Sequence, residues 1–147
     1  MNGNKESEVI GFLCNWCSYA AADAAGSGRH RYPTNIRIIR VPCSGRVDPF
    51  FILSALRCGA AAVLTAGCYP GNCHYSTGNL VARRRFAMLK NLLEFTGLEE
   101  GRINLTWMSA AEGVNFARVA TGVAIKAREL GPYRGALRKH SGVPDNE

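Results

Sequence analysis

A short apolar run that ends in a pair of cysteines lies near the start of the chain: Val9-Ile10-Gly11-Phe12-Leu13, followed directly by Cys14-Asn15-Trp16-Cys17. A run of this length and composition, closed by polar residues, is typical of a buried β-strand. Three further apolar runs, rich in β-branched residues, follow along the chain at residues 36–41, 61–66 and 103–108. We therefore predict four short strands, because the β-branched content and the length of these runs favour strands over helix turns.

Segments with helical spacing of apolar residues separate these strands. They cover residues 18–25, 48–59, 79–95 and 109–130. Strands that alternate with helices indicate parallel pairing, because each connection must cross back over the sheet. The sequence thus predicts an α/β fold: a single small domain with a mostly parallel four-stranded sheet and flanking helices, of the Rossmann or flavodoxin-like type.

Local signals predict where the helices begin. Asp48 precedes Pro49, and an Asp side chain can accept hydrogen bonds from the first free amides while Pro suits the first helical position. Ser109 and Glu112 match the capping-box pattern, in which each side chain bonds the other residue's amide. We therefore expect the last helix to begin at Ser109.

Length and composition favour one soluble domain. We expect 147 residues to form a domain at 8–131, with a polar tail at 1–7 and a basic tail at 132–147. No apolar run approaches the roughly 20 residues that span a bilayer, and no export signal is visible, so we expect a cytoplasmic protein. The formal net charge of +7 suits an acidic protein partner or a nucleic acid. Most aromatic residues lie within apolar runs, which argues against nucleic acid.

Five of the six cysteines follow predicted strands: Cys14, Cys17, Cys43, Cys68 and Cys73. The carboxyl ends of parallel strands meet at one edge of a sheet, so we expect these thiols to converge there. Ser109 and Glu112 follow the fourth strand and should face the same edge. Cys58 falls on a helix instead, and we interpret it as a small buried residue outside the site.

Converging thiols have three chemical explanations. Four thiolates can hold a zinc ion in a tetrahedron or an iron–sulfur cluster, and a Cys-x-x-Cys pair alone can be a redox-active dithiol. The loops rich in Gly, Asn and Pro favour a cluster, because their amides can bond sulfur and tune its reduction potential. We expect Trp16, Tyr69 and Tyr75 to shield the site from water. We expect His74 to lie next to the ligands without being one of them, and Asp23 to support the Cys14–Cys17 loop.

Long motifs around these cysteines resemble one known family. They are Phe12-Leu13-Cys14-Asn15-Trp16-Cys17-Ser18-Tyr19, Arg40-Val41-Pro42-Cys43-Ser44-Gly45-Arg46-Val47-Asp48-Pro49, Ala66-Gly67-Cys68, Asn72-Cys73-His74-Tyr75 and Ser109-Ala110-Ala111-Glu112-Gly113. Over residues 8–130 the sequence resembles the delta subunit of methyl-viologen-reducing hydrogenase. Two positions depart from the family's pattern: Tyr69 stands where histidine is common, and Ala61 replaces an acidic residue.

The resemblance implies a [2Fe–2S] electron-transfer subunit that is not itself catalytic. Its partners would be a nickel–iron hydrogenase or formate dehydrogenase on one side and the flavin subunit of heterodisulfide reductase on the other. Such hetero-oligomeric complexes bifurcate electrons in methanogenesis. The family's cysteines map onto Cys14, Cys17, Cys43, Cys68 and Cys73, five thiols for four ligand positions, and we expect Cys68 or Cys73 to be the extra one. The alternatives are a zinc-stabilised basic binding module and a Cys-x-x-Cys dithiol oxidoreductase, with no membrane contact in any of the three cases.

Overall fold

The four predicted strands form one parallel sheet in the computed structural model, which describes residues 7–135. They are β1 (Val9–Cys14), β2 (Ile36–Val41), β3 (Ala62–Gly67) and β4 (Ile103–Trp107), in the spatial order β2-β1-β3-β4. All three neighbouring pairs run parallel. The predicted α/β class and four-stranded sheet are confirmed, and the order matches the first strands of a flavodoxin-like sheet.

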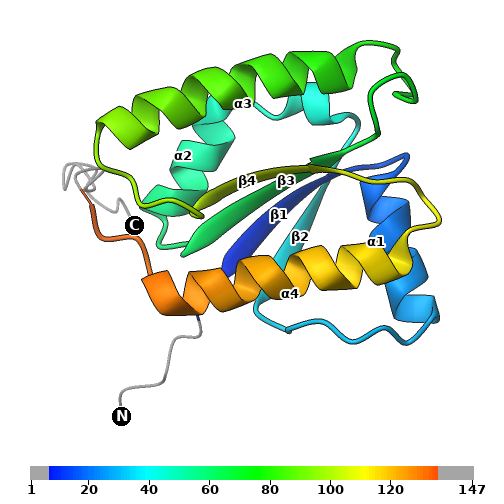
Figure 1. Ribbon diagram of the computed structural model, residues 1–147, viewed down its shortest axis with the longest axis horizontal. Coiled ribbons are helices and arrows are strands. Elements are labelled where there is room, and N and C mark those ends of the chain that lie inside the picture. Colours follow the sequence, from blue (N-terminus) through cyan, green and yellow to red (C-terminus); the bar gives the residue numbers. More distant parts are fainter. Residues whose placement is uncertain (1–6, 136–147) are drawn as a thin grey trace, which may run out of the picture.

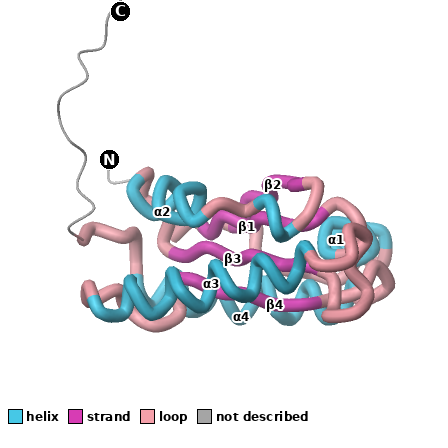
Figure 2. Tube along the Cα trace, turned by 90° about the horizontal axis from the view of Figure 1, so that it is seen from above, coloured by secondary structure: helices cyan, strands magenta, loops and turns pink. Residues whose placement is uncertain are grey.

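Helices cover both faces of this sheet, as Figures 1 and 2 show. α1 (Ser18–Ser27) and α4 (Gly113–Leu130) lie on one face, and α2 (Pro49–Arg57) and α3 (Gly78–Phe95) lie on the other. A short 3₁₀ helix, η1 (Ser44–Arg46), follows β2. The central strands β1 and β3 are therefore buried from both sides, which explains why β3 has no alternation of buried and exposed residues. The edge strand β2 is partly exposed, at Arg37, Ile39 and Arg40.

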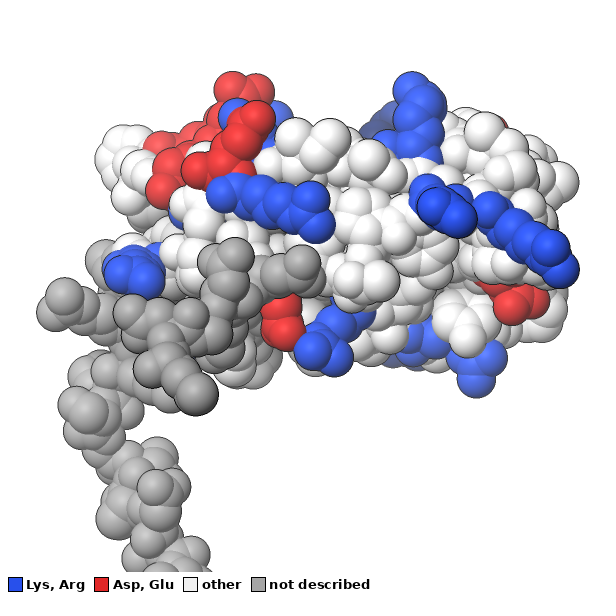
Figure 3. Space-filling view, turned by 90° about the horizontal axis from the view of Figure 1, so that it is seen from below, with Lys and Arg blue, Asp and Glu red and all other residues white. Residues whose placement is uncertain are grey.

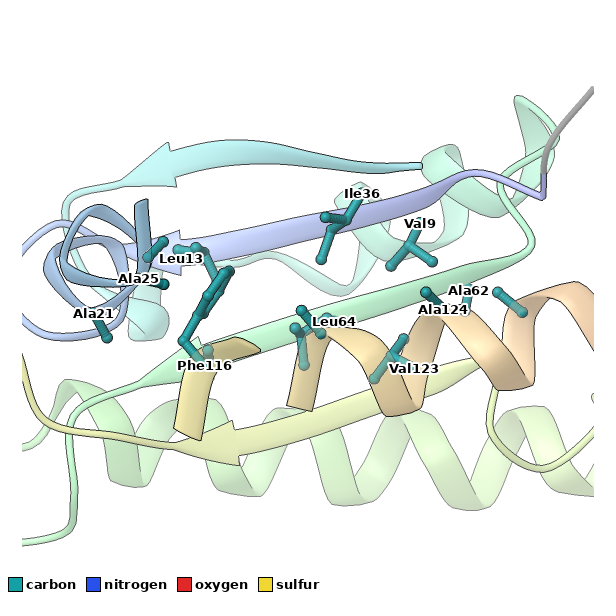
Figure 4. Packing of buried hydrophobic residues seen from close by; sticks show 14 of the residues in the cluster. Val9, Leu13, Ala21, Ala25, Ile36, Ala62, Leu64, Phe116, Val123 and Ala124 are labelled. Atoms are coloured by element: carbon teal, nitrogen blue, oxygen red, sulfur yellow. The ribbon is translucent and has the colours of Figure 1, made fainter. Parts of the chain in front are cut away.

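The core on the α1 and α4 side is built from small and branched residues (Figure 4). Leu13 and Leu64 from the sheet pack in the same cluster as Phe116 of α4 and Ala21 of α1. Gly113 lets the two helices approach closely, because a Cβ there would lie 2.7 Å from the amide nitrogen of Ala25. The second core, beneath α2 and α3, contains Ile52, Leu56, Leu89 and Leu93.

The helix starts test the predicted capping signals. Asp48 caps α2 as predicted, since its carboxylate accepts a hydrogen bond of 2.8 Å from the Phe50 amide. The predicted start of the last helix at Ser109 is wrong, because α4 begins at Gly113. The Glu112 carboxylate does accept from the Ser109 amide at 2.6 Å, but the Glu112 amide bonds the Ser109 carbonyl. This pairing closes a separate turn before the helix.

The flanking segments expected at residues 1–7 and 132–147 lie mostly outside the described residues. Between residues 7 and 135, none of the helices combines the length and the hydropathy needed to cross a membrane.

Candidate metal centre

The predicted cysteine edge lies where the chain reverses its direction across the sheet. β1 and β3 are neighbours, and the chain continues from them to β2 and β4 on opposite sides. The loops after two such strands diverge and leave a crevice, which is where open α/β sheets bind ligands. Cys14 ends β1 and Cys68 follows β3, and their Sγ atoms lie 3.6 Å apart in this crevice. Both side chains are buried.

A second pair of thiols lies beside the first. Cys43 precedes η1, Cys73 lies in the loop between β3 and α3, and their Sγ atoms are 3.9 Å apart. Cys14, Cys43, Cys68 and Cys73 all line one narrow space between the loops, too small for a water molecule, which we call the cysteine cavity. The predicted convergence of thiols at one sheet edge is thus confirmed.

The remaining two cysteines differ sharply in position. Cys17 is half-buried, and its Sγ atom lies within 4.8 Å of those of Cys14 and Cys68, although it does not line the cavity. Cys58 is exposed and follows α2, where it lines a surface groove with Glu8 and Ile10 at the start of β1. The expectation that Cys58 is buried is wrong, since its side chain is exposed at the residue that caps α2, but Cys58 lies outside the site as expected.

Backbone amides point at several of the sulfurs. The Cys17 amide lies 3.4 Å from the Cys14 Sγ, and the Gly45 amide lies 3.4 Å from the Cys43 Sγ. Burial would raise the pKa of Cys73, but the amides of Asn79, Tyr75 and Gly78 outweigh it and lower that pKa below its ordinary value. Two of those amides belong to the first turn of α3, whose dipole adds positive potential at the sulfur.

The thiols do not share one electrostatic environment. Burial tends to raise the pKa of Cys14, but hydrogen bonds from Ser18 and Cys17 bring it below its ordinary value. Burial raises the pKa of Cys17, Cys43 and Cys68. The neighbouring thiols raise the pKa of Cys43 and Cys68 further, whereas at Cys17 a hydrogen bond with Cys68 opposes the rise. Several adjacent thiolates are therefore stable together only when a cation balances their charge. The donor set suits a thiolate-bound metal centre.

Two glycines make room for the sulfurs. A Cβ at Gly78 would collide with the Cys43 Sγ and lie 3.3 Å from the Cys73 Sγ. A Cβ at Gly45 would lie 2.7 Å from the Gly78 carbonyl oxygen, so the two backbones also touch each other. Only glycine fits at either position without moving the Cys43 loop or the start of α3.

Two buried polar residues that the sequence analysis did not select hold the cysteine loops. The Ser18 hydroxyl accepts from the Cys14 amide at 2.7 Å and donates to the Ala66 carbonyl at 2.7 Å, which joins β1 to β3. The Asn79 side chain donates to the carbonyls of Cys68 and Tyr69 at 3.0 and 2.8 Å. Asp23, predicted to support the first loop, is exposed, and Ser18 has that role instead. In the sequence, Ser18 directly follows Cys17 and Asn79 stands at the start of a predicted helix. These positions were the signal that could have identified both residues as supports of the cysteine loops.

Three rings close the cavity toward solvent. Trp16 and His74 stack with their centroids 3.6 Å apart, and the Trp16 Nε1 donates to the Tyr75 hydroxyl at 3.4 Å. All three residues line the cysteine cavity, so the expected shielding by Trp16 and Tyr75 is confirmed. Tyr69 does not line it, and its hydroxyl donates instead to Glu112 at 3.1 Å, which ties the turn after β4 to this edge.

Comparison with known proteins identifies the family. The family model for methyl-viologen-reducing hydrogenase, delta subunit, matches residues 9–131. The chain belongs to this family. The match spans every strand and helix described above, as well as all five converging cysteines.

Named relatives of the delta-subunit family fall into two groups. The chain is 47% identical over 134 residues to the F420-non-reducing hydrogenase iron-sulfur subunit of Archaeoglobus profundus, covering 91% of this chain and 98% of that protein. It is 45% identical over 145 residues to the vhc iron-sulfur subunit of the F420-non-reducing hydrogenase of Methanococcus voltae, covering 99% of each chain.

The second group consists of longer proteins. The chain is 45% identical over 139 residues to one subunit of the ferredoxin/F420H2-dependent CoB-CoM heterodisulfide reductase of Methanosarcina acetivorans. That match covers 95% of this chain but 18% of the reductase protein. The same domain therefore occurs within a much longer chain.

Proposed function

We propose that this chain is an iron–sulfur electron-transfer subunit that holds one [2Fe–2S] cluster at the cysteine edge. The main support for the proposal is the arrangement of four thiols as two close pairs around one cavity. A tetrahedral metal with thiolate bonds of about 2.3 Å holds its sulfurs about 3.8 Å apart. The Cys14–Cys68 and Cys43–Cys73 separations, 3.6 and 3.9 Å, both suit that value. Two such pairs provide for two irons.

This arrangement makes Cys17 the extra thiol in our proposal. The sequence favoured Cys68 or Cys73 for that place, because they share a loop. However, both of these residues line the cavity and each has a close thiol partner, whereas Cys17 does not line it. The amides that reach Cys14, Cys43 and Cys73 would stabilise the ligated thiolates. When bound, the cluster supplies one-electron redox chemistry.

The proposed partners follow from the relatives. The Archaeoglobus relative is named as the iron-sulfur subunit of a hydrogenase, and the Methanosarcina relative carries the same domain within a heterodisulfide reductase. A domain that is fused in one organism and separate in another commonly binds the protein to which it is elsewhere joined. We therefore propose that residues 8–131 relay electrons from a nickel–iron hydrogenase or formate dehydrogenase to the flavin subunit of heterodisulfide reductase. Electron bifurcation at that flavin and a cytoplasmic location belong to the same proposal.

Iron and sulfide analysis of anaerobically prepared protein tests the cluster. We expect about two irons and two sulfides per chain, the content of one [2Fe–2S] cluster, with an EPR signal after reduction. Cys17→Ala and Cys58→Ala should keep the iron, whereas Cys14→Ala, Cys43→Ala, Cys68→Ala and Cys73→Ala should each lose it. If Cys17→Ala lost its iron and Cys68→Ala kept it, the ligand assignment would be overturned. The proposal that the protein holds a cluster would still stand.

A zinc site is the second candidate, because Cys14, Cys17 and Cys68 place three sulfurs within 4.8 Å of one another. One zinc ion could use these three thiols and take a fourth ligand nearby. A colourless protein that binds one zinc after anaerobic reconstitution would favour this function. The dithiol alternative is weaker, because the Cys14 sulfur is buried and a substrate disulfide could not reach it.

A further inference from the structure

Two open grooves meet on the outer side of the cysteine cavity. The first, of about 630 Å³, is lined by Cys43, Arg46, Phe51 and Arg85 among others. The second, of about 450 Å³, lies beside Trp16 and Arg40. Pro42 and Tyr75 line both grooves and also the cysteine cavity itself. The grooves therefore form one surface directly over the four thiols, which we name the cysteine face.

The charge of the cysteine face is positive. Arg40, Arg46 and Arg85 are exposed, and none of them forms an ion pair with a carboxylate of residues 7–135. Arg85 donates instead to the Gly45 carbonyl at 2.7 Å, which fixes its guanidinium over the groove. Among the described lining residues Asp48 is the one carboxylate, and it is bonded to the Phe50 amide.

On the side of the molecule drawn in Figure 3, acidic side chains gather mostly at one end. The largest acidic area lies at the left end, whereas the right end, where the loops after the strands lie in Figure 1, shows several basic side chains and little acidic surface. A charge separation of this kind orients a docking partner before contact, because the field acts over about 10 Å at moderate salt.

Exposed rings lie among these arginines. The exposed fractions of Trp16, Phe51 and Tyr75 are 44%, 43% and 52%. Trp, Tyr and Arg are the residues that most often carry the binding free energy of protein interfaces. A surface that combines all three directly over the thiols is better suited to a protein partner than to a small ligand, because its grooves are open.

We infer that the cysteine face is the docking surface for an electron-transfer partner that presents carboxylates around its own redox centre. This inference rests on the proposed function, since it assigns the surface through which the cluster exchanges electrons. The partner's carboxylates would pair with Arg40, Arg46 and Arg85, and its apolar centre would pack on Tyr75 and Pro42. Contact there places the partner against residues that line the cysteine cavity.

Charged oxidants of small size test the field at this surface in the full-length, cluster-loaded protein. One electron passes from the reduced centre to ferricyanide, giving ferrocyanide, or to tris(phenanthroline)cobalt(III), giving the cobalt(II) complex, with no bond broken. We compare the rate of oxidation by ferricyanide, an anion, with the rate of oxidation by the cobalt(III) cation. At low salt, we expect the ratio of the first rate to the second to fall about fivefold in Arg40→Gln/Arg46→Gln. That double variant leaves the Arg85 hydrogen bond intact. Arg128→Gln, at the far end of α4, also removes positive charge from the surface and should leave the ratio unchanged.

A measurement without iron separates this inference from the proposed function. In the metal-free full-length chain, a thiolate displaces methanesulfinate from an anionic or a cationic methanethiosulfonate and forms a mixed disulfide. We expect the half-buried Cys17 and Cys73 to prefer the anionic reagent, and the exposed Cys58 to serve as the internal reference. Loss of the preference in Arg40→Gln/Arg46→Gln supports the inference even if no cluster forms. The inference would be overturned if all three cysteines showed the same preference between the two reagents. It would also be overturned if sedimentation showed a dimer formed through this face.

Discussion

At the level of single residues, the site depends on two glycines, which have no Cβ, as well as on the cysteine sulfurs. Gly78 has no Cβ, and the Cys43 and Cys73 sulfurs occupy the space that one would fill. Gly45 touches the backbone of Gly78 in the same way. A side chain at either position must displace a thiol loop, and a displaced thiol cannot keep the spacing that a metal centre requires.

Gly78→Ala should therefore lower the iron content of the purified protein by at least about half, because the added methyl group displaces a ligand loop by van der Waals overlap. The control is Gly122→Ala in α4, where a Cβ meets no atom within 4 Å. That variant should keep its iron and gain about 0.5–1 kcal/mol in the free energy of unfolding. Full iron occupancy in Gly78→Ala would show that the loop relaxes freely and that close packing at this glycine does not position the sulfurs.

At the level of helices and strands, one buried arginine joins three segments at the end of the sheet opposite the cysteines. Arg102, just before β4, is 2% exposed. Its guanidinium donates to the carbonyls of Ala61, Leu130 and Gly131 at 2.8, 3.2 and 2.8 Å, and it pairs with Glu99 at 2.7 Å. The last two carbonyls end α4, so the arginine both caps that helix and attaches it to the start of β3.

Arg102→Ala should reduce the free energy of unfolding by about 3 kcal/mol, because one buried and two half-buried carbonyls lose their donor. Urea denaturation followed by circular dichroism measures this change. Arg128→Ala removes an exposed arginine from the last turn of α4 and should change stability by less than about 0.5 kcal/mol. Equal effects of the two substitutions would mean that Arg102 contributes charge alone.

Across the whole molecule, the metal centre would tie together the loops that follow β1, β2 and β3. Those loops lead to α1 on one face of the sheet and to α2 and α3 on the other. A centre bound by Cys14, Cys43, Cys68 and Cys73 therefore connects both layers of helices. A ligand that binds only the folded state adds its binding free energy to the stability of the entire domain.

Removal of the metal with a chelator under anaerobic conditions should lower the midpoint of thermal unfolding by at least about 5 °C. Anaerobic scanning calorimetry of loaded and stripped protein provides the comparison. In Cys58→Ser, the unfolding midpoints of the loaded and the stripped protein should differ by the same amount, because Cys58 is exposed and outside the site. An identical midpoint with and without metal would indicate that the loops are held by protein contacts alone.

Local sequence patterns were enough to establish the fold class and the location of the site. Four apolar runs alternating with helical segments require a parallel sheet, and parallel strands bring their carboxyl ends, with Cys14, Cys43 and Cys68, to one edge. These conclusions follow from residue patterns and from chain connectivity. Asp48 was predictable for the same reason, since its bond to Phe50 spans two residues.

The pairing of the thiols and the contacts that support them depend on three-dimensional packing. The Cys14–Cys68 contact exists because β1 lies next to β3, and strand order is a long-range property that no local pattern encodes. The same holds for Ser18, which bonds a carbonyl 48 positions away, and for Gly78, whose neighbour Cys43 belongs to another loop.

The start of α4 was missed for a different reason. The Ser109–Glu112 pattern suits an isolated turn as well as a helix start, so the pattern alone does not distinguish the two. The Tyr69 hydroxyl, from the loop between β3 and α3, donates to Glu112 and holds it in the turn. This contact spans more than 40 positions of the chain, and only the folded chain brings the two residues together.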